Sequence, residues 1–178
     1  MFMGSSLGNY FDGEIVGLLR LILGVMGPRD RLLLGVDRCH GPRKPAHIIH
    51  TAYNDAAGYT AAFALNALSH ANRVAGLDFD ESQWRHEAVY DEARCSIVTH
   101  VVAREDLELR GGAAGGAAGG LRRSFRAGER IFMAHSLKFD EARIHAFAAE
   151  AGMASSRSWL DDMYLLVELR PRLPRVEL

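Results

Sequence analysis

Residues 1–9 (MFMGSSLGN) decide the fold of this chain. They begin as an apolar strand and pass at once into a turn of glycine and serine that Asn9 closes. A buried parallel strand needs neighbours on both edges and cover on both faces, because its backbone groups and apolar side chains are otherwise unpaired. We therefore expect this chain to be the later part of a larger α/β domain.

A helix and a second strand follow the opening turn. Asp12 is a suitable cap for a helix over about 13–26, whose apolar residues recur at helical spacing. Residues 31–37 (RLLLGVD) are apolar up to the final aspartate, as expected of a parallel strand that is covered on both faces. Parallel strands end at one edge of a sheet, where α/β proteins bind ligands, so we expect Asn9 and Asp37 to lie near any site.

Changes of pattern divide the chain into three parts. Residues 1–42 form the strand-helix-strand part of the sheet, and residues 138–178 add a last helix (140–151) and a closing strand hairpin (158–160 and 164–170). Residues 43–137 are an insertion on the substrate side, with helices first and a β-meander after them. The expected helices cover about 45–53 and 57–74, and the expected strands cover 84–90, 95–103, 107–110, 121–126 and 130–137. Within the meander, the low-complexity segment 111–120 (GGAAGGAAGG) is predicted to be a floppy hairpin tip.

Composition excludes several classes of function. A chain of 178 residues, 48% of them hydrophobic, is long enough for one core. A net charge of −1 gives no field that would attract nucleic acid or an anionic membrane, so neither is expected as a partner. The most apolar run, 15–26, is short and contains Arg20, which argues against an export signal or a membrane span. Cys39 and Cys95 lack the spacing of a metal site or a disulfide framework, so we expect two reduced thiols and a cytoplasmic protein.

Two motifs give weak support to other functions, a serine hydrolase and a metal site. Residues 4–8 (GSSLG) match the G-x-S-x-G pattern of a serine hydrolase with Ser6 as nucleophile, but residues 9–12 separate this serine from the first helix signals. His40, His47 and His50 are close in sequence, yet no acidic residue follows at a matching spacing. We therefore predict no metal site and keep the hydrolase as a lesser alternative.

Five stretches carry a resemblance to a known family: FMGSSLGN (2–9), LLLGVD (32–37), AYNDAAGYTAAFALNALSHANR (52–73), DFD (78–80) and RAGERIFMAHSLKF (126–139). In this order, over nearly the whole chain, they resemble the histidine-specific methyltransferases of ergothioneine biosynthesis, which depend on S-adenosylmethionine (SAM). The same family includes fungal relatives that methylate a prenylated tryptophan.

The resemblance implies a Rossmann-like class I methyltransferase that transfers methyl groups from SAM to the α-amino nitrogen of an amino acid. It also implies that Asn9 and Tyr53 hold the amino-carboxylate end of the substrate and that Ser136 faces its side chain. Methyl transfer needs no covalent enzyme intermediate, so we expect positioning groups and no further catalytic residue.

Two positions depart from the family pattern at the substrate side chain. Histidine-specific members place a glutamate two residues before the serine, where this chain has Ala134, and Thr99 replaces a methionine of the pocket. Without that glutamate a buried imidazole N–H would lose its partner, at a cost of about 1–3 kcal/mol. An indole-bearing amino acid is therefore an alternative to histidine as substrate.

The family's glycine-rich loop and acidic residue for SAM have no counterpart in this sequence. These elements belong to the first strands of the fold, so we expect the SAM site upstream of Met1, with Gly4 and Ser5 adjacent to it. On this interpretation the chain is a fragment whose partner is the missing N-terminal half. A non-catalytic module that binds an amino acid, or a degenerate paralogue, is the alternative.

Overall fold

The computed structural model describes residues 1–111 and 120–172. The predicted hairpin tip, apart from its end residues Gly111 and Gly120, lies outside the described residues. The chain forms two compact units: the first contains Met1–Ala46, Asp91–Ser96 and the residues from His135 on, and the second contains His47–Tyr90 and Ile97–Ala134. Each unit is described by itself below.

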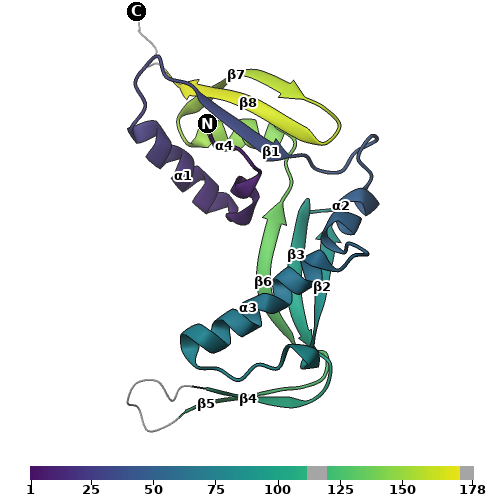
Figure 1. The fold of residues 1–178 in the computed structure, drawn as a ribbon. Coiled ribbons are helices and arrows are strands. Elements are labelled where there is room, and N and C mark those ends of the chain that lie inside the picture. Colours follow the sequence, from purple (N-terminus) through teal and green to yellow (C-terminus); the bar gives the residue numbers. More distant parts are fainter. Residues whose placement is uncertain (112–119, 173–178) are drawn as a thin grey trace, which may run out of the picture. The chain divides into compact units, whose positions relative to one another are not determined.

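The first unit is a three-stranded sheet covered by two helices (Figure 1). Its strands are β1 (Leu32–Asp37), β8 (Tyr164–Pro171) and β7 (Met153–Leu160), in the order β1-β8-β7 with both pairs antiparallel. Phe2 forms a parallel bridge to Leu34 on the other edge of β1. The predicted strand at the N-terminus is thus present as a short bridge, and the predicted closing hairpin is confirmed.

One face of this sheet carries the core. Helices α1 (Asp12–Gly24) and α4 (Glu141–Glu150) pack against alternate residues of β1 and β8, among them Leu34 and Val167. The residues between them in β1 are only half-buried, so the strand is buried on one face. The expected cover on both faces is therefore wrong for the described residues. The error arose because an apolar run does not distinguish a strand covered on both faces from one covered on a single face.

The start of α1 also differs from the prediction. Phe11 precedes the helix, and its backbone N–H donates to the Glu14 carboxylate at 2.8 Å. Asp12 is the first helical residue and pairs with Arg143 at 2.7 Å instead of capping the helix. A glutamate three residues into a helix can reach back to the amide before it, and this contact sets the boundary here.

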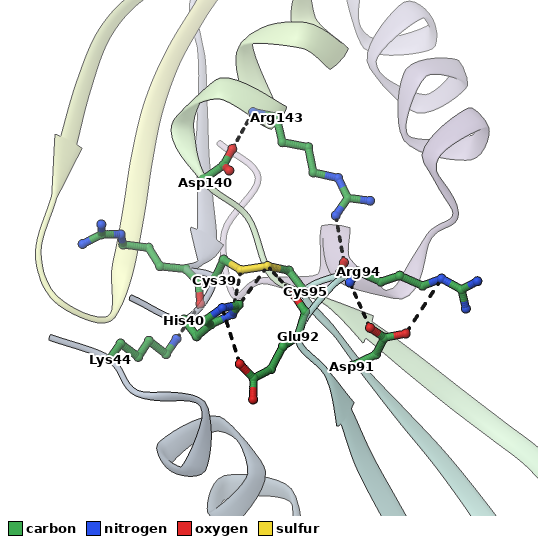
Figure 2. Close-up of a disulfide and its surroundings, with 10 residues drawn as sticks. Cys39, His40, Lys44, Asp91, Glu92, Arg94, Cys95, Asp140 and Arg143 are labelled. Carbon is green, nitrogen blue, oxygen red and sulfur yellow. Dashed lines mark hydrogen bonds and ion pairs between the residues drawn. A yellow bond between two sulfur atoms is a disulfide. The ribbon is translucent and has the colours of Figure 1, made fainter. Parts of the chain in front are cut away.

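Cys39 and Cys95 form a disulfide, which corrects the expectation of two reduced thiols (Figure 2). Their Cα atoms lie 5.6 Å apart, although 56 positions separate them in sequence. Cys39 follows the end of β1, and Cys95 lies in the turn before β3. Sequence spacing could not show this pairing, because the two residues meet only through the tertiary fold.

The second unit contains helices α2 (Ala46–Tyr53) and α3 (Tyr59–Ala75) and the short 3₁₀ turn η2 (Glu81–Gln83). Its strands β2 (Trp84–Asp91), β3 (Ser96–Ala103) and β6 (Arg130–Leu137) form a sheet in the order β2-β3-β6 (Figure 1). Strands β4 (Leu107–Gly111) and β5 (Leu121–Phe125) pair separately. The predicted helices and strands of this region are all present, with bounds that differ by at most two residues.

The core of the second unit lies between its helices and one face of its sheet. Leu68 of α3 packs with Trp84 and Val101, while Ile49 of α2 packs with Ala88 and Ile97. Across the described part of the chain, no helix is both long and apolar enough to cross a membrane.

Asp55 caps the start of α3, and this role can be tested by titrating its carboxyl group. Its carboxylate accepts hydrogen bonds from the backbone N–H groups of Tyr59 and Thr60, each at 2.8 Å. Hydrogen bonds from the Thr60 side chain and from these two amides lower the pKa of Asp55 from 3.8 to about 2. Because the folded pKa is depressed, the stability that this group contributes is present above the unfolded pKa and is lost as pH falls through the folded one.

We predict that an NMR titration of the Asp55 carboxyl gives a midpoint near 2, with the amide signals of Tyr59 and Thr60 moving over the same range. In Asp55→Asn this movement should be absent. A midpoint at the ordinary value of 3.8 would contradict the capping role.

Candidate functional site

The opening turn presents Asn9 at the surface of the first unit. Gly4 and Ser5 both have positive φ, at 82° and 56°, and the turn continues into the 3₁₀ helix η1 (Ser6–Asn9). Leu7 of η1 is buried in the core, which anchors the turn, while Asn9 is exposed. A side chain of fixed position with a donor and an acceptor therefore lies at the end of this turn.

Gly8 brings this turn against the end of β6. A Cβ at Gly8 would clash with the Leu137 carbonyl oxygen and would lie 3.3 Å from the Ser136 hydroxyl. Phe11, just after the turn, stacks on His135 of the same strand with 4.2 Å between ring centroids. The first unit thus brings together the loop of Asn9 and Ser136, two of the residues predicted to bind substrate.

Two buried lysines join Ser136 to the end of β1. Lys138 Nζ donates to Ser136 Oγ at 3.0 Å and pairs with Asp37 Oδ2 at 2.9 Å. Lys44 Nζ pairs with the other carboxylate oxygen of Asp37 and donates to the Arg38 carbonyl at 2.8 Å. Both lysines are buried, at 5% and 2% exposure for Lys44 and Lys138. Asp37 is thus connected through Lys138 to Ser136, one of the residues predicted to bind substrate.

This network sets the chemistry available at Ser136. Since the hydroxyl oxygen accepts a hydrogen bond from an ammonium group, its own proton points away from Lys138, and the polarised hydroxyl is a stronger donor. Lys138 is buried at 2% exposure, so its contact in this direction is the Ser136 hydroxyl. The sequence placed Lys138 in a candidate segment beside Ser136 but indicated no role for it or for Lys44, because nothing in a sequence distinguishes a buried, paired lysine from a surface one.

Tyr53 lies in the second unit, at the end of α2. It is half-buried against the cluster of Ile49, Ala88 and Ile97. The next residue, Asn54, fixes the corner after the helix, since its side-chain amide donates to the carbonyls of His50 and Ala88 at 3.0 Å each. These two hydrogen bonds therefore hold the turn after α2 against strand β2.

Side chains alternate along β3 and β6, and this places Thr99 and Ala134, both predicted to face the substrate's side chain, on different faces of the sheet. Ile131 and Met133 of β6 pack in the core that α3 covers, so Ala134 points to the opposite face, as Phe132 does. Ile97 and Val101 of β3 face the helices, and Thr99 between them faces the same way. Ala134 and Thr99 thus lie on opposite faces of the sheet. Ser136 alternates in step with Ala134 along β6.

His86 of β2 is a titratable group that the sequence analysis missed. It is half-buried, and its Nε2 has no hydrogen-bond partner among the described residues. Burial lowers the pKa of His86, and the nearby Asp55 carboxylate partly opposes this shift. The ring is therefore neutral near pH 7. Its only sequence signal was a histidine within a strand pattern.

Gly4 and Ser5 line a cavity of about 400 Å³ in the first unit. The rest of its lining is largely apolar and includes Trp159 and Tyr164. The carboxylate in the lining, Asp161, accepts the backbone N–H groups of Met163 and Tyr164 at 2.7 Å each. A SAM site needs a carboxylate for the ribose hydroxyls and a glycine-rich loop, so these residues alone do not fit SAM and supply at most one wall.

The geometry does not favour the hydrolase alternative. A nucleophile elbow strains the nucleophile itself, whereas the left-handed residue here is Ser5 and Ser6 begins η1. No histidine or carboxylate hydrogen-bonds to Ser6 within the described residues.

Metal-ligand side chains gather at one place in the described part of the chain, where Cys39, His40 and Cys95 meet. The two sulfurs there are bonded to each other. His47 and His50, which the sequence places close to His40, are not part of this group.

Comparison with known proteins identifies the family. Residues 1–169 match the family described as histidine-specific methyltransferase, SAM-dependent. This chain belongs to that family. Its sheet, with helices on one face and an antiparallel closing hairpin, is part of an α/β methyltransferase fold. Members of the family use SAM as the methyl donor.

Several curated relatives support this assignment. Histidine N-alpha-methyltransferase of Mycobacterium tuberculosis is 35% identical over 162 residues, which cover 91% of this chain and 48% of the relative. Ergothioneine biosynthesis protein 1 of Neurospora crassa is 31% identical over 162 residues, covering 89% of this chain and 17% of the relative. An L-tryptophan methyltransferase of Psilocybe serbica is 27% identical over 177 residues, with coverages of 96% and 46%. The chain spans about half the length, or less, of these methyltransferases.

A substitution at Gly8 tests the contact that holds the Asn9 loop against β6. We predict that Gly8→Ala lowers the free energy of unfolding by about 1–3 kcal/mol, because the added methyl group displaces the Leu137 backbone. The matched control is Gly17→Ala, in the middle of α1, where an added Cβ meets no atom within 4 Å. That change should raise stability by about 0.5–1 kcal/mol. Urea unfolding of the three proteins provides the measurement, and equal stability of Gly8→Ala and wild type would disprove the contact.

Proposed function

We propose that this chain holds the acceptor of a SAM-dependent N-methyltransferase that acts on the α-amino group of an amino acid. The observation that carries the proposal is the contact of Gly8 with β6, which fixes Asn9 and Ser136 in one unit. These are two of the three positions that the family resemblance assigns to the substrate. The name of the Mycobacterium tuberculosis relative, a histidine N-alpha-methyltransferase, supports the same class of reaction.

Methyl transfer requires these residues to orient the acceptor. SAM supplies an electrophilic methyl group, and the acceptor nitrogen must present its lone pair in line with the bond that breaks. An Asn9 side-chain amide can donate to the acceptor's carboxylate through its nitrogen and accept from its amine through its oxygen. Holding reactants in this way can supply a large part of the rate enhancement, about 7–11 kcal/mol in favourable systems. We propose a separate contact with the substrate's amino-carboxylate end for Tyr53, from the resemblance alone.

We propose that the donor site requires residues beyond those of this chain. The carboxylate in the cavity beside Gly4 and Ser5, that of Asp161, is bound through one oxygen to the backbone of its own turn, and the relatives are about twice as long as the matched region. A non-catalytic module that binds an amino acid remains the second candidate, because the same lack of donor groups also fits a chain that binds without transferring methyl groups.

The isolated chain should therefore bind SAM weakly. We predict that calorimetric titration of the chain with SAM shows no micromolar binding. The positive control is the chain extended by the part of the Mycobacterium tuberculosis relative that lies outside the matched region, which should bind SAM and methylate an amino acid. Micromolar binding by the isolated chain contradicts the proposed division, and an extended protein that binds an amino acid without methylating it would favour the non-catalytic module.

The acceptor's side chain is proposed to be histidine or an indole. Ala134 and Phe132 point to the same side of β6 as Ser136, and Phe132 is 52% exposed. This surface offers an aromatic ring and a methyl group in place of a carboxylate, which suits an apolar aromatic side chain. The L-tryptophan methyltransferase of Psilocybe serbica is consistent with such an acceptor within the family.

A carboxylate at position 134 tests this selectivity. We predict that Ala134→Glu raises the affinity for L-histidine relative to L-tryptophan by about tenfold, because a hydrogen bond to a charged group is worth about 1.5–3 kcal/mol. Ala127→Glu, on an exposed turn of the same unit, is the matched control and should leave the ratio unchanged. The two affinities can be measured from chemical-shift changes of the isotope-labelled chain. An unchanged ratio in Ala134→Glu would show that the acceptor's side chain lies elsewhere.

Free amino acids are cytoplasmic metabolites, and we propose the cytoplasm as the place of this reaction. Nucleic acids and membranes are not proposed as partners, because the net charge of −1 provides no attraction to their phosphates.

A further inference from the structure

The disulfide lies beside a histidine at an accessible place in the first unit. Cys39, His40 and Cys95 are all half-buried, and Figure 2 shows the imidazole against the two sulfur atoms. His40 Nδ1 lies 3.3 Å from Cys39 Sγ and 3.8 Å from Cys95 Sγ. A base in contact with both sulfurs favours thiol–disulfide exchange near neutral pH, because the thiolate is the reacting form.

The backbone holds the two cysteines in place whether or not they are bonded. The Cys39 N–H donates to the Phe139 carbonyl at 2.9 Å, and the Lys138 N–H donates to the Cys95 carbonyl at 2.7 Å. Both cysteines are thus fixed to one short segment, and their Cα separation of 5.6 Å lies in the normal range for a disulfide.

The charged groups around His40 are mostly paired with one another. Glu92 is the carboxylate that faces the ring, 3.8 Å from Nε2, and it forms an ion pair when the ring carries a proton. Of the other charges drawn in Figure 2, Lys44 pairs with Asp37, Arg94 with Asp91 and Arg143 with Asp12, while Asp140 caps α4. His40 is therefore the group placed to exchange a proton with either sulfur.

We propose that Cys39 and Cys95 form a reversible exchange site for low-molecular-weight disulfides, with His40 as the proton acceptor. His40 takes the proton of the Cys39 thiol, and the thiolate attacks the small disulfide, breaking its S–S bond and releasing one small thiolate, which His40 or water protonates. Cys95 then gives its proton to His40 or water, and its thiolate attacks the Cys39 sulfur of the mixed disulfide. The bond from Cys39 to the small molecule breaks, and the second small thiolate leaves and takes up that proton. In sum, two protein thiols are oxidised and one small disulfide is reduced to two thiols.

Oxidation has a structural consequence for the neighbouring segment. Lys138 and Phe139 lie between the backbones of the two bonded cysteines, and Leu137 alone separates them from Ser136. The disulfide therefore restrains the opening of this segment. The exchange chemistry does not depend on the proposed methyltransferase function, whereas an effect on substrate binding through Ser136 rests on it.

Exchange with glutathione tests the proposal on the full chain. The reduced chain is mixed with oxidised glutathione at about pH 7, samples are trapped with an alkylating reagent, and the disulfide is quantified by mass spectrometry. We expect His40→Asn to form the bond about tenfold more slowly than wild type, since unassisted thiols ionise only near pH 8.5. Above about pH 9.5 the two rates should converge, because all thiols are then ionised. His47→Asn, at an exposed position, should behave as wild type.

A second measurement does not depend on the variants. Hydrogen exchange at the amides of Cys39, Lys138 and Phe139 should be slower in the oxidised chain than in the reduced one. The proposal is overturned if the thiols stay reduced in oxidised glutathione, if His40→Asn reacts as fast as wild type at pH 7, if hydrogen exchange at these amides is the same in both redox states, or if the reduced chain binds a zinc ion at Cys39, His40 and Cys95. None of these outcomes bears on methyl transfer, so failure of the exchange site can be told from failure of the proposed function.

Discussion

The carboxylate of Asp37 is the group on which the rest of the first unit depends. Two buried ammonium groups, those of Lys44 and Lys138, meet at its two oxygens at the end of β1. Burial of an unpaired charge costs several kcal/mol, so neither lysine could occupy its position without this carboxylate. The ion pairs join the segment after β6 to the end of β1, together with the backbone hydrogen bonds of Phe139 to Asp37 and Cys39. Ser136 and the Gly8 contact lie next to this junction.

The ion pairs at Asp37 also relate the position of β6 to the choice of acceptor. One strand, β6, carries Ser136 next to the lysine network and Ala134 two residues earlier on the same side. The strand thus presents a polarised hydroxyl followed by a small apolar side chain.

Local sequence patterns predicted the helices and strands well. They did not predict the contacts between residues far apart in sequence. The strand at 32–37, the helix that Asp140 caps and the closing hairpin were all visible, because spacing and turn residues define them within a few positions. The Cys39–Cys95 bond and the burial of Lys44 and Lys138 depend on segments far apart in sequence, so no local signal existed. For the candidate site, resemblance supplied Asn9 and Ser136, while strand alternation, which requires the structure, put Thr99 and Ala134 on opposite faces of the sheet.

A double-mutant cycle between Asp37 and Lys138 tests the central claim most directly. The free energies of unfolding of wild type, Asp37→Asn, Lys138→Met and the double variant give the coupling of the two side chains. The account predicts that each single change destabilises the chain, and that the double variant is more stable than additivity allows by about 1–3 kcal/mol. A coupling energy near zero would mean that Asp37 does not hold Lys138, and that the end of β6 is placed by something else.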